Sequence, residues 1–247
     1  MVSELHEFFN SVDLIVFLIF GIFAVLFCIR WYRPLIKTPQ IAGDSYSRVI
    51  LILLPLVLFI IMYTVLSNYA SFDVVDSVIY KTFYIVLGYA WLYFGLVLMS
   101  VLFGLIYPDD AVHLNNKAAL IAITGEMLAL TAIYAGANIG DGPGWWCVFF
   151  AGGLGLAAWI ILGLVYHFFT GIFERITVDR DLGSAVRFFI YLVLSGIILG
   201  YACSGDWTSF LKTLEEFLAG WTVLPLTLVM ILLELFFQRS EKHEGNL

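Results

Sequence analysis

Apolar residues in this chain come in long, uninterrupted runs. A run of about 20 apolar residues crosses the ~30 Å hydrocarbon core of a bilayer as an α-helix. About seven such runs occur, near residues 12–31, 48–67, 81–106, 117–138, 146–172, 184–203 and 213–237. No long polar segment separates them. The pattern therefore predicts an all-α integral membrane protein with about seven transmembrane helices and no soluble domain.

Composition and net charge indicate which kinds of molecule the chain is expected to contact. Of its 247 residues, 62% are hydrophobic and only 13% are charged, whereas soluble domains are about half apolar and about a quarter charged. We therefore expect the lipid bilayer to be its solvent. The formal net charge is −7. Binding to nucleic acid needs clustered Lys and Arg, so this balance argues against a nucleic-acid partner.

The distribution of Lys and Arg predicts the orientation of the runs. Residues 1–11 hold no Lys or Arg, so we expect a retained first span rather than a cleavable signal. Cytoplasmic loops are enriched in basic residues. Ten basic residues fall on one side, against Lys81 and Lys212 on the other, which places the N-terminus outside and the C-terminus in the cytoplasm. The ten are Arg30, Arg33, Lys37, Arg48, Lys117, Arg175, Arg180, Arg187, Arg239 and Lys242.

Helix-capping residues divide the runs into a lead helix and three helical hairpins. Asp44, Asn115 and Asp181 each precede a new run and are spaced 71 and 66 residues apart. Asp and Asn side chains accept hydrogen bonds from the free N–H groups of a first helical turn. Trp145, Trp146 and Trp207 are expected at the outer interface, and Trp31 at the inner one. Pro55 and Pro225 are expected to kink their helices.

Two stretches of the chain resemble a known bacterial family. They are Asn115-Asn116-Lys117-Ala118-Ala119 followed by Gly125, and Asp179-Arg180-Asp181-Leu182-Gly183-Ser184-Ala185, with Ala202-Cys203 closing the sixth run. Together they resemble the doubled hairpin of the YjfL-type inner-membrane family of unknown function, over about residues 110–238. The resemblance implies residues 110–247 as the doubled-hairpin domain, with 1–109 an N-terminal transmembrane region. It implies a bacterial inner membrane but no reaction, and Glu126 departs from the family pattern.

Glu126 and His167 are the ionisable side chains predicted deepest in the membrane. Glu126 follows Lys117 by nine residues, which puts it about 14 Å deep, and His167 is about 10 Å from the same face. Buried ionisable groups are costly, so each is a functional hypothesis. One interpretation is that the two share a proton or hold a cation during transport. The other is that Glu126 stays protonated and bonds a neighbouring carbonyl or threonine.

Two further sets of residues are expected to shape the bundle. Arg187 and Glu234 lie near the cytoplasmic boundary of the last two runs and are expected to form a salt bridge, with snorkelling of Arg187 to the headgroups as the alternative. Small residues let membrane helices approach closely. Two GxxxG pairs are expected to pack within the chain or against a second copy: Gly136 with Gly140, and Gly196 with Gly200.

The remaining polar residues give weaker signals. Cys147 and Cys203 are expected as buried thiols, with a disulfide as the alternative, because both fall near the outer face. Asn138 and Asp141 are expected in a capped turn rather than a cation site. The cluster of Asp109, Asp110 and His113 is the nearest approach to a metal site, and we expect neither a metal nor a cofactor.

Three functions are compatible with this pattern. The absence of catalytic motifs favours a non-enzymatic membrane component of envelope maintenance or of a larger complex, acting as a homo-oligomer or with a membrane or cytoplasmic partner protein. The alternative is a small transporter or channel with Glu126 as its proton or cation site. A lipid-modifying enzyme is the weakest of the three, because no set of polar side chains converges at one headgroup level.

Overall fold

The computed structural model describes residues 12–38 and 45–244. Within them, seven helical segments are long and apolar enough to cross a membrane, which confirms the prediction of an all-α polytopic membrane protein. The segments are α2 (Val12–Lys37), α3 (Ser45–Asn68), α5 (Val78–Leu102), α6 (Lys117–Ala137), α7 (Trp145–Thr170), α9 (Leu182–Ala202), and α10 (Phe210–Phe217) continued by α11 (Val223–Glu244).

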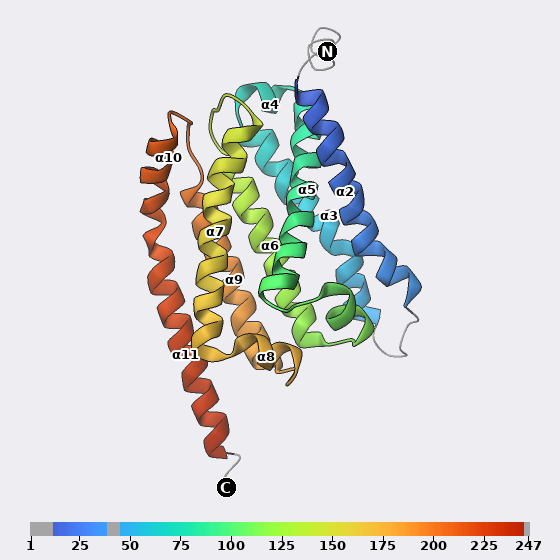
Figure 1. Ribbon diagram of the computed structural model, residues 1–247, viewed down its shortest axis with the longest axis vertical. Helices are drawn as coiled ribbons and strands as arrows, with labels where there is room; N and C mark the ends of the chain where they lie inside the picture. The colour runs from blue at the N-terminus through green and yellow to red at the C-terminus, as the bar shows by residue number, and fades with distance from the viewer. Residues whose placement is uncertain (1–11, 39–44, 245–247) are drawn as a thin grey trace.

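The chain passes up and down the bundle as a lead helix and three hairpins (Figure 1). The short helix α4 (Phe72–Asp76) closes the first hairpin, and tight turns close the other two. We call this end of the bundle the turn end. At the opposite end, the cap end, lie η1 (Tyr107–His113) and α8 (Ile172–Thr177). Helix α2 begins at the turn end and α11 finishes at the cap end, as an odd number of crossings requires.

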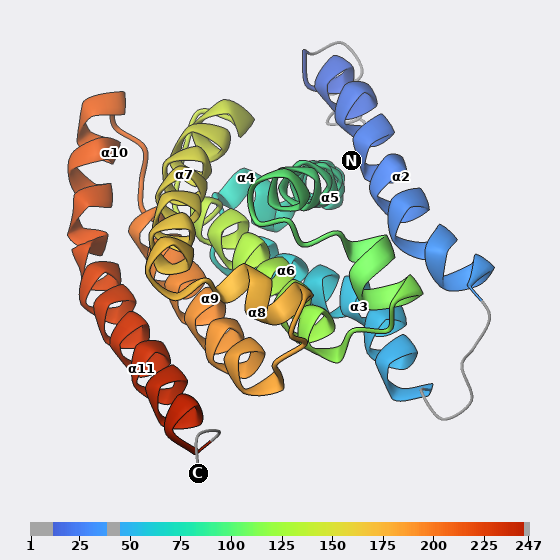
Figure 2. The same cartoon turned by 60° about the horizontal axis from the view of Figure 1, so that its bottom comes forward.

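Helix α6 lies at the centre of the bundle. It contacts α3, α5, α7 and α9, and these helices surround it when the bundle is viewed obliquely from the cap end (Figure 2). Most of its residues are buried, whereas α2 and α11 lie on the outside and expose large apolar side chains such as Ile22 and Leu228. A helix that is apolar on all sides fits the interior, because every face finds an apolar neighbour.

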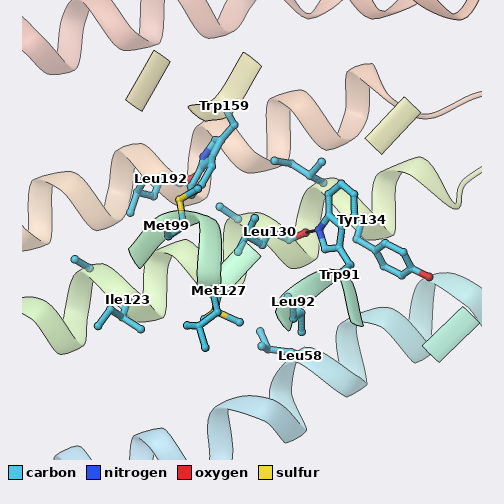
Figure 3. Packing of buried hydrophobic residues seen from close by; sticks show 14 of the residues in the cluster. Leu58, Trp91, Leu92, Met99, Ile123, Met127, Leu130, Tyr134, Trp159 and Leu192 are labelled. Carbon is cyan, nitrogen blue, oxygen red and sulfur yellow. Dashed lines mark hydrogen bonds between the residues drawn. The ribbon is translucent and has the colours of Figure 1, made fainter. Parts of the chain in front are cut away.

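Tryptophan side chains join neighbouring helices of the bundle. The indole N–H of Trp91 on α5 donates to the Leu130 carbonyl oxygen on α6 at 3.1 Å. Trp159 on α7 donates to the Leu192 carbonyl oxygen on α9 at 3.3 Å. Figure 3 shows both indoles among the buried apolar side chains of this region. A buried Trp N–H needs an acceptor, and a helix carbonyl can accept this second hydrogen bond without breaking the helix.

Two expectations about aromatic and proline positions are corrected. Trp31 does not face the lipid headgroups: it is fully buried and stacks on Tyr107, with ring centroids 4.1 Å apart. Pro55 lies inside α3 as expected. Pro225 instead lies in the first turn of α11, directly after the 3₁₀ segment η2 (Leu218–Thr222). A first turn tolerates proline because its N–H groups have no helical partner, so the seventh crossing is interrupted before Pro225 rather than kinked at it.

Candidate functional site

The first turns of α6 and α9 are capped in the same way. The Asn116 side-chain oxygen accepts from the N–H groups of Ala118 and Ala119 at 3.0 and 3.2 Å. Asp181 does the same for Gly183 and Ser184 at 2.8 and 3.2 Å. The cap of α6 is thus Asn116 and not Asn115, which instead adopts a left-handed backbone with φ of 48°. The expected cap at Asp44 lies outside the described residues.

The expected ion pair between Arg187 and Glu234 is present at the cap end. Arg187 Nε lies 2.5 Å from Glu234 Oε2, and an Arg187 terminal nitrogen lies 3.2 Å from Glu234 Oε1. The Glu234 side chain is fully buried, so its charge has no access to water. The Arg187 guanidinium also lies over the ring of Phe237, 4.7 Å from its centroid. Arg187 therefore pairs across α9 and α11 rather than extending to the headgroups.

Residues that the sequence did not single out extend this pair into a cluster. Ser184 Oγ lies 2.6 Å from Glu234 Oε1 and 2.7 Å from Asp181 Oδ2. Arg175 on α8 donates through Nε to Ser184 Oγ at 2.9 Å and to Asp181 Oδ2 at 3.1 Å. We call these five residues, Arg175, Asp181, Ser184, Arg187 and Glu234, the cap-end cluster. It holds two cations and two carboxylates and ties α8, α9 and α11 together.

Within the cap-end cluster, burial and hydrogen bonding act in opposite directions on the pKa of Asp181. Burial by itself raises the pKa of this carboxyl, but the hydrogen bonds from Arg175 and Ser184 outweigh it and lower the pKa to about 2.

The side-chain amide of Gln238 extends the cluster along α11, where it donates to the Thr170 carbonyl oxygen of α7 at 2.8 Å. Donors and acceptors of the cluster are thus largely satisfied by one another.

Glu126 lies midway along α6 and is 1% exposed. Its Oε1 atom has no hydrogen-bond partner within the described part of the chain. His167 is engaged near the end of α7: its ring stacks on Phe173 at 4.0 Å, and its Nδ1 accepts from the Phe173 N–H at 3.4 Å. Nδ1 also lies 3.6 Å from Glu174 Oε2. The contacts of His167 are therefore local ones, and the proposed proton sharing with Glu126 stays a hypothesis.

The turn end is held by backbone hydrogen bonds between successive turns. The N–H of Gly140 donates to the Tyr69 carbonyl oxygen at 3.1 Å, and the N–H of Gly205 donates to the Ile139 carbonyl oxygen at 2.9 Å. Asp206 accepts from the Asp141 N–H at 2.8 Å, so it caps that turn. Gly140 and Gly205 have φ of 103° and 127°, which favour glycine.

A small cavity of about 40 Å³ lies among these turns and is lined in part by Asn138, Cys147 and Cys203. Asn138 donates to the Tyr134 carbonyl oxygen at 2.7 Å, as expected for a capped helix end. Both cysteines are free, so the alternative of a disulfide between them is not realised. Cys203 Sγ lies 3.1 Å from the Ala151 carbonyl oxygen, and burial raises the pKa of this thiol to about 12.

Most of the expected glycine contacts lie inside the chain. A Cβ at Gly136 would overlap the Gly200 carbonyl, and one at Gly200 would overlap the Ala132 carbonyl. A Cβ at Gly196 would lie 2.6 Å from the Ala129 Cα. These glycines bring α6 and α9 into direct backbone contact, as small residues do in membranes. Gly140 packs in the turn-end crossing, against Gly205, and not along a helix.

The Asp109, Asp110 and His113 cluster is only partly assembled. Asp109 Oδ1 lies 3.0 Å from His113 Nδ1, and both side chains are exposed. Asp110 instead accepts from the Ile106 N–H at 2.7 Å. Burial of Asp110 raises the pKa of its carboxyl. Within residues 12–38 and 45–244, no three His, Cys, Asp or Glu side chains are grouped as metal ligands would be.

No family model, curated protein or solved structure matches this chain. Two arrangements of the residues described above bear on function instead: the buried charges at the cap end and the isolated carboxyl in α6.

Proposed function

We propose that the protein is a non-enzymatic component of a bacterial cytoplasmic membrane, serving as a scaffold in envelope maintenance or in a larger membrane complex. The observation that carries this proposal is the cap-end cluster. Buried Glu234 is bound by Arg187 and Ser184, and these contacts fix α9 against α11. A buried ion pair adds little net stability, but separating its partners is very costly. Such a cluster suits a fixed assembly better than helices that must move during transport.

The matching geometry around the two caps supports the proposed relationship to the YjfL-type family. The Asn116 N–H donates to the Asp110 carbonyl oxygen, and the Asp181 N–H donates to the Arg175 carbonyl oxygen, both at 2.9 Å. Each bond spans six residues, and α6 and α9 have the same length of 21 residues. We infer from this that residues 110–238 are a doubled hairpin of that type.

The orientation is proposed from the basic residues. Residues in the first and last turns of the crossings at the cap end include Lys37, Lys117 and Arg239, whereas the turn end carries Lys81 and Lys212. Positive charge favours the cytoplasmic side. The cap end therefore faces the cytoplasm in this proposal, and the N-terminal end of α2 lies outside.

A small proton or cation transporter is the second candidate, and Glu126 is the observation that favours it. A carboxyl with an unpartnered buried oxygen in the middle of a membrane helix is costly, and such groups are commonly functional. Against this, Glu126 is buried, and it does not line the cavities described at the turn end, between α2 and η1, or between α7 and α11.

One pair of measurements separates the two candidates. The purified protein is reconstituted in liposomes that contain a pH-sensitive dye, and the wild type is compared with Glu126→Gln under an imposed proton or potassium gradient. In parallel, a bacterial strain lacking the protein is tested for detergent and osmotic sensitivity with each form restored. The scaffold proposal expects no flux above protein-free liposomes and equal rescue by both forms. Flux that is lost in Glu126→Gln would overturn it in favour of the transporter.

A further inference from the structure

An open groove of about 430 Å³ lies at the cap end between α2 and the chain around η1. Its polar part is formed by Arg30 and Arg33, one helical turn apart on α2, and by Asp109 of η1. Leu26 and Ile29 on α2 and Tyr93 on α5 form its apolar part, which continues toward the middle of the membrane. The groove therefore has a cationic region near the membrane surface and an apolar region beneath it.

The two arginines have unused hydrogen-bonding capacity. Within the described residues, Arg30 Nε is buried without a hydrogen-bond partner, and neither Arg30 nor Arg33 forms an ion pair. A buried guanidinium nitrogen without an acceptor is costly, and a phosphate oxygen is an acceptor that arginine binds well. Asp109 also lines the groove, but its ion pair is with His113, and no ion pair joins it to either arginine within the described residues.

Depth indicates which anion fits the groove. Arg30 lies seven residues before the end of α2 at Lys37, about 10 Å along the helix, and arginine side chains reach from such depths to the headgroup level. Leu26 and Ile29 are 36% and 50% exposed on the surface that faces lipid. A free anion would use only the arginines, whereas a phospholipid would use the apolar region as well.

We propose that this groove is a binding site for an acidic phospholipid. Its headgroup phosphate lies against Arg30 and Arg33, and an acyl chain lies along Leu26, Ile29 and Tyr93. The site is independent of the scaffold function, since it uses neither the cap-end cluster nor Glu126. A direct hydrogen bond from each arginine to the phosphate contributes about 1 kcal/mol, or roughly fivefold in affinity.

The test compares retained lipid in the full-length protein by native mass spectrometry after titration with phosphatidylglycerol. The wild type is expected to retain one phosphatidylglycerol more tightly than phosphatidylcholine with the same acyl chains. Arg30→Gln and Arg33→Gln are each expected to weaken this retention roughly fivefold, because each removes a direct hydrogen bond to the phosphate. Lys37→Gln is the matched control, because it removes a charge from the same helix outside the groove, where solvent and salt screen it from the bound phosphate, and it should change retention by less than about twofold.

Three outcomes would overturn the proposal. Equal weakening by Lys37→Gln would show diffuse attraction to the charged end of α2. Competition by inorganic phosphate at millimolar concentration would show a site for a free anion. Unchanged retention in the Arg30→Gln, Arg33→Gln double variant would show that the arginines do not bind lipid, provided that its unfolding temperature matches that of the wild type.

Discussion

The indole N–H of Trp31 donates a hydrogen bond to the carbonyl oxygen of Leu51, over 2.8 Å. Leu51 precedes Pro55 by four residues in α3, so its carbonyl is the one that a proline deprives of its helical donor. A buried carbonyl without a donor is costly in a membrane, where water does not replace the bond. Trp31 on the lead helix thus supplies the donor that Pro55 cannot supply.

Trp31→Phe is therefore expected to destabilise the protein, by about 1 kcal/mol for the lost hydrogen bond in addition to the lost ring contact. The loss should be smaller in a Pro55→Ala background, because an alanine in place of the proline would restore the helical N–H donor to Leu51. A double-mutant cycle of unfolding in SDS-containing micelles measures this coupling. A coupling energy of zero would mean that the indole does not compensate for the proline.

Gly200→Val is expected to disrupt the crossing of α6 and α9. The added side chain meets the Ala132 backbone, which cannot move aside as a flexible side chain would, so we expect a loss of about 3 kcal/mol. Gly153→Val is the matched control, since a Cβ there meets nothing within 4 Å. Thermal unfolding in detergent should rank Gly200→Val well below both Gly153→Val and the wild type. Equal unfolding temperatures for the two variants would contradict the close crossing.

Arg187→Leu is expected to cost about 3–5 kcal/mol, because it removes the nearer cation from the buried carboxyl of Glu234 and leaves only Arg175, whose Nε lies 3.8 Å from Oε1. Removing the charge on both sides, in Arg187→Leu with Glu234→Leu, should cost less than the single change. The comparison is made by unfolding in SDS-containing micelles. A double variant that is less stable than Arg187→Leu would show that Arg175, Ser184 and Gln238 are adequate partners for the carboxyl without Arg187.

Asp181 is expected to make the free energy of unfolding depend on pH under acidic conditions. Its pKa of about 2 is below the ordinary value of about 3.9, so its contribution is present above about pH 4 and is lost as the pH falls toward 2. Asp181→Asn keeps a good capping side chain but removes the charge. The difference in unfolding temperature between wild type and variant should stay constant from about pH 7 to 5 and shrink below about pH 4. A difference that does not change with pH would refute this assignment.

The lengths of the apolar runs and the positions of the charged residues were enough to predict the seven crossings, the cap at Asp181 and the pairing of Arg187 with Glu234. Each depends on position along the helix axis, which sequence spacing gives directly at about 1.5 Å per residue. The choice between Asn115 and Asn116 depended instead on one backbone angle, because both residues are good caps.

Contacts around a helix axis were harder to predict than depth. Glu126 and His167 were matched by depth alone, and the structure gives His167 local partners in Phe173 and Glu174 instead. Arg175 and Ser184 carried no distinct signal, because a basic loop residue and a serine near a cap are both ordinary at a membrane surface. Their roles depend on the packing of α8 and α11 against α9, which the sequence does not show.

The hydrogen bonds from Gly140 to Tyr69 and from Gly205 to Ile139 restrict how the three hairpins can separate. Each closing turn is anchored to the one before it through backbone groups, and glycines supply the donors. Any widening of the bundle must therefore pivot about that edge and begin at the opposite one. At that opposite edge, a hydrogen bond from Gln238 to the Thr170 carbonyl oxygen joins the third hairpin to the second and must break first, whereas Arg187 and Glu234 lie within the third hairpin and would move with it as one unit.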